Sequence, residues 1–279
     1  MSLVWRIRDT DHDLSRRGMI MGIVNVTPDS FSDGGRFLDT GRAVEHALRL
    51  VEEGADILDI GGESTRPGAE PVDEDEELRR VLPVIRALRS ATRTLISIDT
   101  MKASVARAAL DAGADIINDV TGLRGDPAMS RVAAACNAGL VIMHMIGTPQ
   151  TMQLQPQYDD VVAEVRTYFD ERLQLLARLG IAPERVALDP GFGFGKTLEH
   201  NLTLVRALPR LAESGRPLLV GISRKSMIAR LLEDDRLDSR DWPTVALTSH
   251  MREHGARLFR VHDVKPNAHA LRMTEAILG

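Results

Sequence analysis

The chain has 279 residues, 43% of them hydrophobic, and its 35 basic side chains against 40 acidic ones give a net charge of −5. A chain of this length can form one α/β barrel, so we expect a single domain over residues 1–279. The negative charge argues against non-specific binding to nucleic acid, although a local basic pocket is compatible with it. We therefore predict no nucleic-acid partner.

Cys136 is the only cysteine, which excludes a disulfide framework and a cysteine zinc site. It follows the apolar run Val132–Ala135, and we expect a buried, inert thiol. The N-terminal segment carries Arg6, Arg8 and Asp9 and contains no long apolar run, so it predicts neither a signal peptide nor a membrane span. We expect a cytoplasmic protein without a membrane partner.

Short and mostly continuous apolar runs alternate with amphipathic stretches along the chain, as is typical of parallel strands buried on both faces. The predicted strands are Met19–Val26, Ile57–Gly61, Leu95–Asp99, Ile116–Val120, Leu140–Met145, Val186–Asp189, Leu218–Ile222 and Leu258–Val261. The helical patterns between them include Ala43–Glu53, Glu76–Leu88, Val105–Leu110 and Val161–Leu179. Before them all, Val4–Arg8 is predicted to form a short extra strand or a cap.

Glycines mark the ends of several helical patterns, shortly before the next strand, as helix C-caps often do. They are Gly54, Gly113, Gly139 and Gly180. Eight strand–helix alternations without a break in composition predict a closed (β/α)8 TIM barrel. An open doubly wound sheet is the alternative, because eight strands also permit that fold.

Polar side chains stand at or just after the C-terminal end of each predicted strand. They are Asn25, Glu63, Asp99, Asn118, His144, Asp189, Ser223 and His262. In a parallel barrel these ends gather on the face that carries the active site. Polarity often returns where a strand ends, so any one of these residues could be merely structural, but eight in succession predict a site.

Several of these side chains favour particular ligands. Asp99, Asn118 and Asp189 can hydrogen-bond a flat heterocycle that carries an amino-imine edge and a lactam. Asp189 alone could equally cap the turn that follows it. Arg260 and His262, two residues apart on the last strand, face the same way and, with Lys225, predict a site for phosphate or diphosphate.

Three other features are interpreted as not carrying the chemistry. The glycines of Gly191–Lys196 lack the Walker spacing, so we do not predict ATP binding and expect them to allow a close approach of the backbone. His144 has no metal-ligand partner at a suitable spacing and is predicted to be structural or to lie at the edge of the substrate. His250 and His254 lack the glutamate of a zincin motif and are predicted to lie on the surface.

Two loops, Thr27–Gly35 and Glu63–Ala69, follow strand ends and are rich in glycine, proline and hydroxyl side chains. Such loops can close over a substrate and exclude water, although either one could be an ordinary surface turn. Phe31 favours closure, because an exposed aromatic side chain normally packs on something.

The order of the motifs resembles that of bacterial dihydropteroate synthases. The segment Met21–Gly35 looks like the first signature of that family, and Asp59–Ala69 looks like the second. Shorter matching motifs follow at Ser97–Thr100, Ile117–Val120, Asp189–Lys196, Ser223–Ser226 and Arg260–Val264. The resemblance implies an enzyme that condenses p-aminobenzoate with 6-hydroxymethyl-7,8-dihydropterin diphosphate, giving 7,8-dihydropteroate and diphosphate.

The resemblance also implies a role for individual residues. The pterin-binding positions match Asp99, Asn118, Asp189 and Lys225. The Mg²⁺ ligand matches Asn25, and the diphosphate contacts match Asn25, Arg260 and His262. The p-aminobenzoate pocket, where sulfonamides compete, matches Phe31, Thr65, Arg66, Pro67, Phe194 and Ser226. The catalytic set is therefore Asn25, Asp99, Lys225, Arg260 and His262. The cofactor implied is Mg²⁺, and the partner implied is a second copy, in a homodimer formed through outer helices.

Two alternatives remain: a pterin-dependent methyltransferase domain and a pterin-binding paralogue without activity. A methyltransferase needs no diphosphate clamp and no aminobenzoate loop, so Asn25, Arg260, His262 and Ser64–Pro67 favour the synthase. Many charge-stabilising groups and no evident covalent nucleophile favour a dissociative displacement. Because the loop residues keep the ordinary family pattern, we predict an enzyme that is sensitive to sulfonamides.

Overall fold

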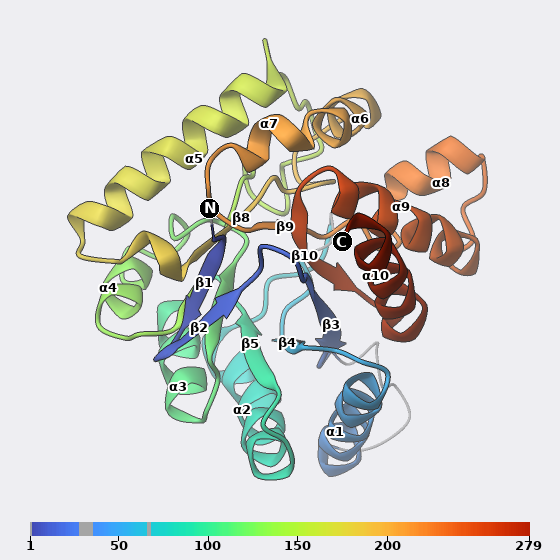
Figure 1. Cartoon of the computed structure of the whole chain (residues 1–279). Coiled ribbons are helices and arrows are strands. Elements are labelled where there is room, and N and C mark those ends of the chain that lie inside the picture. The colour runs from blue at the N-terminus through green and yellow to red at the C-terminus, as the bar shows by residue number, and fades with distance from the viewer. Residues whose placement is uncertain (1, 28–35, 66–67) are drawn as a thin grey trace.

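The computed structural model describes residues 2–27, 36–65 and 68–279. Eight parallel strands form a closed barrel in the order β10-β3-β4-β5-β6-β7-β8-β9, and helices surround it (Figure 1). The last strand pairs with the first, Arg260 standing opposite Met21. The predicted TIM barrel is therefore confirmed, and the open sheet is excluded because its two edges could not pair.

The barrel strands agree with the predicted ones to within two residues at each end. They are β3 (Met19–Asn25), β4 (Ile57–Gly61), β5 (Leu95–Asp99), β6 (Ile116–Asp119), β7 (Gly139–Met143), β8 (Val186–Asp189), β9 (Leu218–Val220) and β10 (Ala256–Val261). The agreement follows from burial on both faces, which requires a continuous apolar run with sharp ends.

Helices follow the barrel strands and cover them. They are α1 (Arg36–Glu52), α2 (Glu74–Ala91), α3 (Ala103–Asp111), α4 (Met129–Ala134), α5 (Val161–Arg178), α6 (Leu198–Arg206), α7 (Leu208–Ala212), α8 (Ser226–Leu232), α9 (Asp241–Glu253) and α10 (Val264–Leu278), with short 3-10 helices η2 (Pro183–Arg185) and η3 (Asp238–Arg240). Helix α2 begins two residues before its predicted start, because the side chain of Asp73 caps it and accepts from Glu76 N at 2.7 Å. Among the described residues, no helix is both long and apolar enough to cross a membrane.

The N-terminal segment is both a strand and a cap. Strand β1 (Val4–Ile7) pairs antiparallel with β2 (Thr10–Asp13), and the hairpin lies against one end of the barrel (Figure 1). Trp5, Ile7 and Leu14 pack there with inward-facing residues near the N-terminal ends of the barrel strands, such as Met21 and Ile57. The indole Nε1 of Trp5 donates to the Arg185 carbonyl at 2.9 Å. The hairpin therefore closes the N-terminal end of the barrel with apolar side chains.

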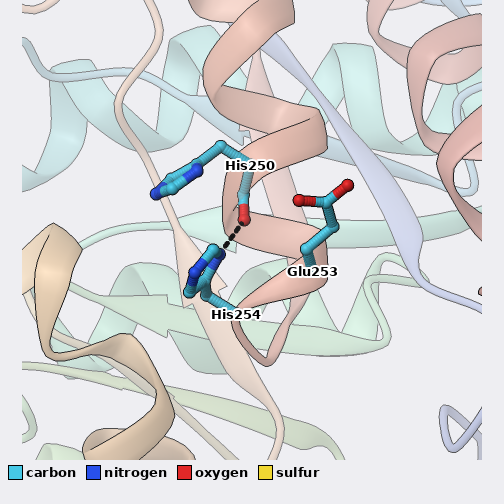
Figure 2. A group of neighbouring side chains, drawn as sticks. All are labelled: His250, Glu253 and His254. Carbon is cyan, nitrogen blue, oxygen red and sulfur yellow. Dashed lines mark hydrogen bonds between the residues drawn. The ribbon is translucent and has the colours of Figure 1, made fainter.

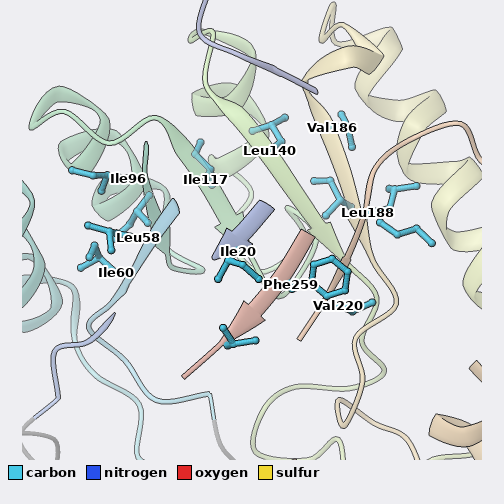
Figure 3. Packing of buried hydrophobic residues seen from close by; sticks show 14 of the residues in the cluster. Ile20, Leu58, Ile60, Ile96, Ile117, Leu140, Val186, Leu188, Val220 and Phe259 are labelled. Carbon is cyan, nitrogen blue, oxygen red and sulfur yellow. The ribbon is translucent and has the colours of Figure 1, made fainter. Parts of the chain in front are cut away.

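The larger core lies between the outward faces of the strands and the helices. Figure 3 shows Leu58 and Ile60 of β4 beside Ile96 of β5, in a cluster that continues around the barrel. Because side chains alternate along a strand, Asp59 and Gly61 face the barrel interior, as Ile57 does. The strand ends can thus present polar groups inward while their neighbours stay in the apolar layer.

Two predictions about single residues are wrong. Gly139 does not cap a helix but begins β7, where a Cβ would lie 3.0 Å from Ile7 Cγ1, so glycine makes room for the hairpin. Cys136 is half-buried rather than buried, and its Sγ lies 3.5 Å from the Ala133 carbonyl. The other predicted caps, Gly54, Gly113 and Gly180, have positive φ angles of 106°, 112° and 76° after their helices.

Candidate active site

Arg260 lies at the centre of a polar network inside the C-terminal end of the barrel. From β10 its Nε donates to Asp59 Oδ2 at 2.6 Å, and its Nη2 donates to Asp99 Oδ2 at 2.7 Å. The side-chain amide of Asn118 donates to both carboxylate oxygens of Asp59, at 3.2 and 3.3 Å. The network joins β4, β5, β6 and β10, so the predicted convergence of Asp99, Asn118 and Arg260 is observed.

Asp59 is a site residue that the sequence prediction misses. Its side chain is fully buried and bonds both Arg260 and Asn118. It lies inside the second signature, in the middle of an apolar strand. A carboxylate at an inward position, between Ile57 and Gly61, is the signal that could have identified it.

The open C-terminal end of the barrel, where the Arg260 network lies, is called the mouth below. Two inward-facing glycines leave space in it. A Cβ at Gly61 would lie 3.7 Å from Asp99 Oδ2 and 3.9 Å from Asn25 Oδ1. A Cβ at Gly221 would lie 3.9 Å from Arg260 Cβ and 4.0 Å from Asp189 Oδ2. Asn25 and Asp189 therefore border the same opening as the Arg260 network.

Asp189, Lys225 and Phe194 form another part of this mouth. Asp189 Oδ1 accepts from Gly191 N at 2.7 Å, so the carboxylate does cap its turn, as the structural alternative proposed, while Oδ2 lies toward Gly221. Lys225 Nζ lies 4.1 Å from the centroid of the Phe194 ring. An ammonium group is attracted to the face of an aromatic ring, so this contact fixes the direction of Lys225.

His262 is held by Ser223 at the end of the neighbouring strand. Ser223 Oγ lies 2.9 Å from His262 Nδ1 and accepts from the His262 backbone N–H at 3.2 Å. A cavity of about 500 Å³ lies beside His262 and Asn25. Two apolar residues, Ile23 and Leu50, line part of it. The rest of the lining is charged or polar: His46, Arg49, Glu53, Arg224 and Asp263.

Methionines form an apolar wall next to the polar network. Val120, Met143, Met145 and Met152 are buried with Phe194 in a cluster of their own, against which Met101 packs. The sequence prediction does not include them, because an isolated methionine in an apolar run has no distinctive pattern. Methionine side chains adapt to the shape of a flat ligand, so the wall suits an aromatic heterocycle.

Glu63 and His144, predicted at the strand ends, do not join this network. Glu63 accepts from Lys102 Nζ at 2.5 Å, in a cluster with Glu77. His144 packs against Tyr168, with ring centroids 5.0 Å apart, and its Nδ1 lies 3.1 Å from Lys196 Nζ. His144 therefore has the packing and hydrogen-bond partners of a structural residue, while its predicted place at the edge of the substrate stays a prediction.

The predicted p-aminobenzoate residues are placed only in part. Phe31, Arg66 and Pro67 lie outside the described residues, as does most of the first loop. Thr65 follows β4 and is half-buried, Phe194 is buried at the mouth, and Ser226 is exposed at the start of α8, next to Lys225.

The glycines at 191, 193 and 195 adopt positive φ angles of 70°, 78° and 61°. A Cβ at Gly191 would lie 2.0 Å from the His144 carbonyl oxygen. The close backbone approach predicted for this segment is therefore observed. The backbone that comes close to this loop is the segment after β7, which begins with His144.

Burial changes the acid–base properties of the network. It raises the pKa of Asp99, an effect that Arg260 opposes and Asp59 increases. Burial also raises the pKa of Asp189 to about 6, while the Gly191 N–H opposes the change. For Arg260, burial favours the neutral form, but Asp59 and Asp99 outweigh it and raise its pKa. The guanidinium therefore stays charged, and Asp189 can change its protonation near neutral pH.

Figure 2 shows His250, Glu253 and His254 as neighbours at the end of α9. One ligand atom of each lies within 4.8 Å of those of the other two. His254 Nδ1 lies 2.7 Å from the His250 carbonyl oxygen. The group precedes β10, so it lies at the opposite end of the barrel from the mouth. His250 is exposed and His254 partly so, which confirms the predicted surface position.

Known proteins identify the family of this site. Residues 21–262 match the pterin binding enzyme family. The chain is 46% identical over 271 residues to the dihydropteroate synthase of Synechocystis sp., covering 97% of this chain and 94% of that protein. The chain belongs to the dihydropteroate synthases. The corresponding Escherichia coli K12 enzyme is 47% identical over 263 residues, with 93% and 92% coverage.

Solved dihydropteroate synthases also share the structure. The Xanthomonas albilineans dihydropteroate synthase with 4-aminobenzoic acid has a TM-score of 0.93 and 46% identity, covering 100% of this chain and 99% of that chain. The same enzyme in complex with 7,8-dihydropteroate has a TM-score of 0.87 and 45% identity, with 96% coverage of both chains. The chain is therefore an enzyme of this family, and the comparisons support the synthase rather than the two alternatives.

Proposed function

We propose that this chain condenses p-aminobenzoate with 6-hydroxymethyl-7,8-dihydropterin diphosphate, releasing 7,8-dihydropteroate and diphosphate. The observation that carries the proposal is the single mouth in which the Arg260 network lies beside Asp189 and Asn25. The Xanthomonas albilineans relative has been solved with 4-aminobenzoic acid and with 7,8-dihydropteroate. These ligands support two small molecules as the substrates.

We assign the pterin ring to Asp99, Asn118, Asp189 and Lys225. A carboxylate at Asp189 can accept from the two donors of an amino-imine edge, while the amide of Asn118 can both donate and accept. Lys225 can donate to the lactam oxygen. The methionine wall supports the assignment, because Met143 and Met145 offer an apolar surface to the flat ring.

We assign the diphosphate to Asn25, Arg260 and His262. A guanidinium carries five N–H donors, and only Nε and Nη2 of Arg260 take part in the bonds to Asp59 and Asp99. Donors therefore remain for an anion above the network. Ser223 holds the His262 ring in a fixed direction, which reduces the entropy lost when the anion binds.

Asn25 is the residue that would hold Mg²⁺. Its Oδ1 lies near the same point above Gly61 as Asp99 Oδ2, and oxygen donors of this kind are the ligands that Mg²⁺ prefers. One or two protein oxygens suffice, because substrate phosphates usually complete the coordination. When bound, the ion supplies positive charge that neutralises the diphosphate.

We propose a dissociative displacement. As the C–O bond to diphosphate breaks, charge accumulates on the leaving group, and Arg260 and His262 stabilise it. The electron-rich dihydropterin supports the cationic methylene group that is left, and an ionised Asp99 favours that cation. The amine of p-aminobenzoate then forms the C–N bond with its lone pair, since an arylamine is nucleophilic without deprotonation, and the ammonium that results releases one proton to water.

A labelled substrate tests this order of events. If bond cleavage precedes attack, a heavy-oxygen label in the bridging position should move to non-bridging positions in the absence of p-aminobenzoate. A covalent enzyme–pterin adduct trapped on the normal path would overturn the mechanism.

We assign p-aminobenzoate to Phe194, Ser226 and Thr65, together with Phe31, Arg66 and Pro67. Phe194 and Ser226 both adjoin Lys225, Phe194 through its ring contact and Ser226 as the next residue. The amine would thus approach the pterin from the side of the β8–α6 and β9–α8 loops.

We further propose a cytoplasmic homodimer. Four exposed apolar side chains belong to α8, the residue before η3 and the start of α9, and both helices contact η3: Leu231, Leu232, Leu237 and Trp242. A patch of this kind commonly marks a protein–protein contact, and sedimentation of the purified chain tests it. A single cysteine, which cannot form an intrachain disulfide, suits a reducing compartment.

The decisive test is an assay for dihydropteroate from the two substrates with Mg²⁺. We expect dihydropteroate and diphosphate in equal amounts, and a much lower turnover in Arg260→Met. Arg257→Met is the matched control, because Arg257 lies on the same strand but bonds the Leu14 carbonyl at the other end of the barrel. Pterin binding without product in the wild type would instead indicate the paralogue without activity.

A further inference from the structure

Lys196 is a buried amine that the proposed reaction does not use. Its side chain lies in the loop between β8 and α6, and only 3% of the residue is exposed. Its Nζ lies 3.1 Å from His144 Nδ1 and donates to the carbonyl oxygens of Phe194, at 3.0 Å, and His144, at 3.3 Å. Buried this completely, the amine cannot reach a substrate, so any effect it has on the reaction must act through these partners.

These contacts tie two segments of the mouth together. His144 directly follows β7, and Phe194 belongs to the loop after β8. Gly191 of the same loop presses against the His144 carbonyl, and Tyr158 donates its hydroxyl to the Gly195 carbonyl at 2.8 Å. Lys196 bonds both segments through its Nζ, which donates to His144 in the first and to Phe194 in the second.

The loop that Lys196 holds carries the contact between Phe194 and Lys225. The ring of Phe194 lies 4.1 Å from Lys225 Nζ, and a Cβ at Gly193 would lie 3.1 Å from Lys225 Cδ. A shift of the Phe194 backbone would therefore move both the aromatic ring and the lysine that rests on it. This is the side of the mouth assigned above to p-aminobenzoate.

We propose that Lys196 is a positioning residue for p-aminobenzoate: by holding the Phe194 and His144 carbonyls, it fixes the Phe194 ring against Lys225. The inference rests on the proposed function, because only that function gives Phe194 and Lys225 their roles. Two buried carbonyl oxygens and a ring nitrogen in one place need hydrogen-bond donors, and an ammonium group brings three.

The chemistry of the cluster allows this role at neutral pH. Burial lowers the pKa of Lys196 to about 7, with Asp189 opposing and Lys225 adding to the effect. Burial, followed by the charge of Lys196, lowers the pKa of His144 to about 3, so its ring stays neutral. A charged amine donates to all three partners. A neutral amine donates to the carbonyls and accepts from His144 Nδ1–H. The charged and the neutral form of Lys196 can therefore both make the three hydrogen bonds.

Lys196→Met tests the inference, with Arg185→Met as the matched control. Arg185 is also a buried cation that donates to two backbone carbonyls, Ala133 and Ala138, but it lies at the hairpin end of the barrel. We expect Lys196→Met to raise the KM for p-aminobenzoate about tenfold with little change in kcat. Arg185→Met should lower the free energy of unfolding and leave that KM unchanged. An unchanged KM in folded Lys196→Met would overturn the inference.

A double variant separates positioning from general loss of stability. If Lys196 acts through Phe194, the KM for p-aminobenzoate in Lys196→Met/Phe194→Ala should equal that of Phe194→Ala alone. Additive effects would overturn the inference. An unchanged KM in Phe194→Ala would instead refute the assignment of the p-aminobenzoate site. Should Lys196→Met not fold, Lys196→Gln serves in the same scheme, because its amide still donates two hydrogen bonds, and a smaller rise in KM is expected.

Discussion

Arg260 on the last barrel strand and Asp59 on the second form an ion pair of 2.6 Å between Nε and Oδ2, although 201 residues separate them. Asp59 is fully buried, and its carboxylate bonds the amide of Asn118 as well as this guanidinium. The same guanidinium bonds Asp99 at 2.7 Å. Arg260 is thus held in place by two carboxylates before any substrate binds.

Replacing Arg260 by methionine should affect both stability and turnover. Two buried carboxylates would lose their cation, and we expect the free energy of unfolding to fall by about 3 kcal/mol. The diphosphate would lose a donor, so kcat should fall by about a hundredfold. Urea denaturation followed by the fluorescence of buried Trp5, together with the product assay, measures the two effects. In Arg260→Met/Asp59→Asn, stability should recover in part without turnover, and a recovery of both would show that Arg260 is only structural.

Removing the Asp189 carboxylate should abolish pterin binding. Asp189→Ala would leave two donors of the pterin ring without an acceptor, and each buried unpaired donor costs about 1–3 kcal/mol. Calorimetric titration with the pterin substrate should therefore detect no binding, whereas Asp170→Ala, on the exposed face of α5, should bind normally. Undiminished affinity in Asp189→Ala would count against the whole assignment of the pterin site.

Pterin affinity should fall in mild acid. Burial raises the pKa of Asp189 to about 6, and below that pH the protonated carboxyl group can no longer accept from both ring donors. Below the pKa of Asp189 the affinity should decrease toward about tenfold per pH unit. Asp189→Asn should show weak binding without this inflection. An inflection of the same size in the asparagine variant would assign the titration to another group.

The same shift has the opposite consequence for stability without ligand. The folded chain holds the Asp189 proton more tightly than the unfolded chain, whose aspartate titrates near a pKa of about 4. The stabilising contribution of this proton is therefore complete below about pH 4 and is lost as the pH rises toward about 6. The difference in unfolding free energy between wild type and Asp189→Asn measures it.

The hairpin residue Trp5 should matter for stability and not for catalysis. Trp5→Ala would leave a cavity at the closed end of the barrel, and we expect a loss of about 3–5 kcal/mol in unfolding free energy. Both KM values and kcat should stay unchanged at a temperature where the variant is folded. Ile277→Ala is the control, because Ile277 is 79% exposed and lies outside the proposed dimer contact, so its replacement should change the stability little. Circular dichroism and the product assay measure both, and a loss of kcat in folded Trp5→Ala would contradict the prediction.

Sulfamethoxazole should inhibit this enzyme in competition with p-aminobenzoate. A competitor for the same pocket raises the apparent KM for p-aminobenzoate and leaves kcat unchanged at saturation. Unimpaired turnover at high sulfamethoxazole and limiting p-aminobenzoate would refute the prediction.

Much of the barrel was determined by local sequence. Strands buried on both faces must be continuously apolar, so the runs at β4, β5 and β8 defined those strands residue by residue. Polar residues interrupt such runs at their C-terminal ends. They identified most residues of the barrel mouth, including Asp99, Asn118 and Asp189. The family motifs assigned Lys225, first predicted for a phosphate site, to the pterin, and they added the p-aminobenzoate residues, which no periodicity identifies.

Only the tertiary structure decided how these residues pair. Asp59 became the partner of Arg260 because barrel closure brings the second and last strands across one interior, and this geometry leaves no trace in either local sequence. Glu63 and His144 follow strand ends, as Asp99 does. Their side chains nevertheless bond Lys102 and Lys196 and do not join the Arg260 network. Strand patterns specify which residues face inward, whereas the contacts among them depend on the closure and stagger of all eight strands.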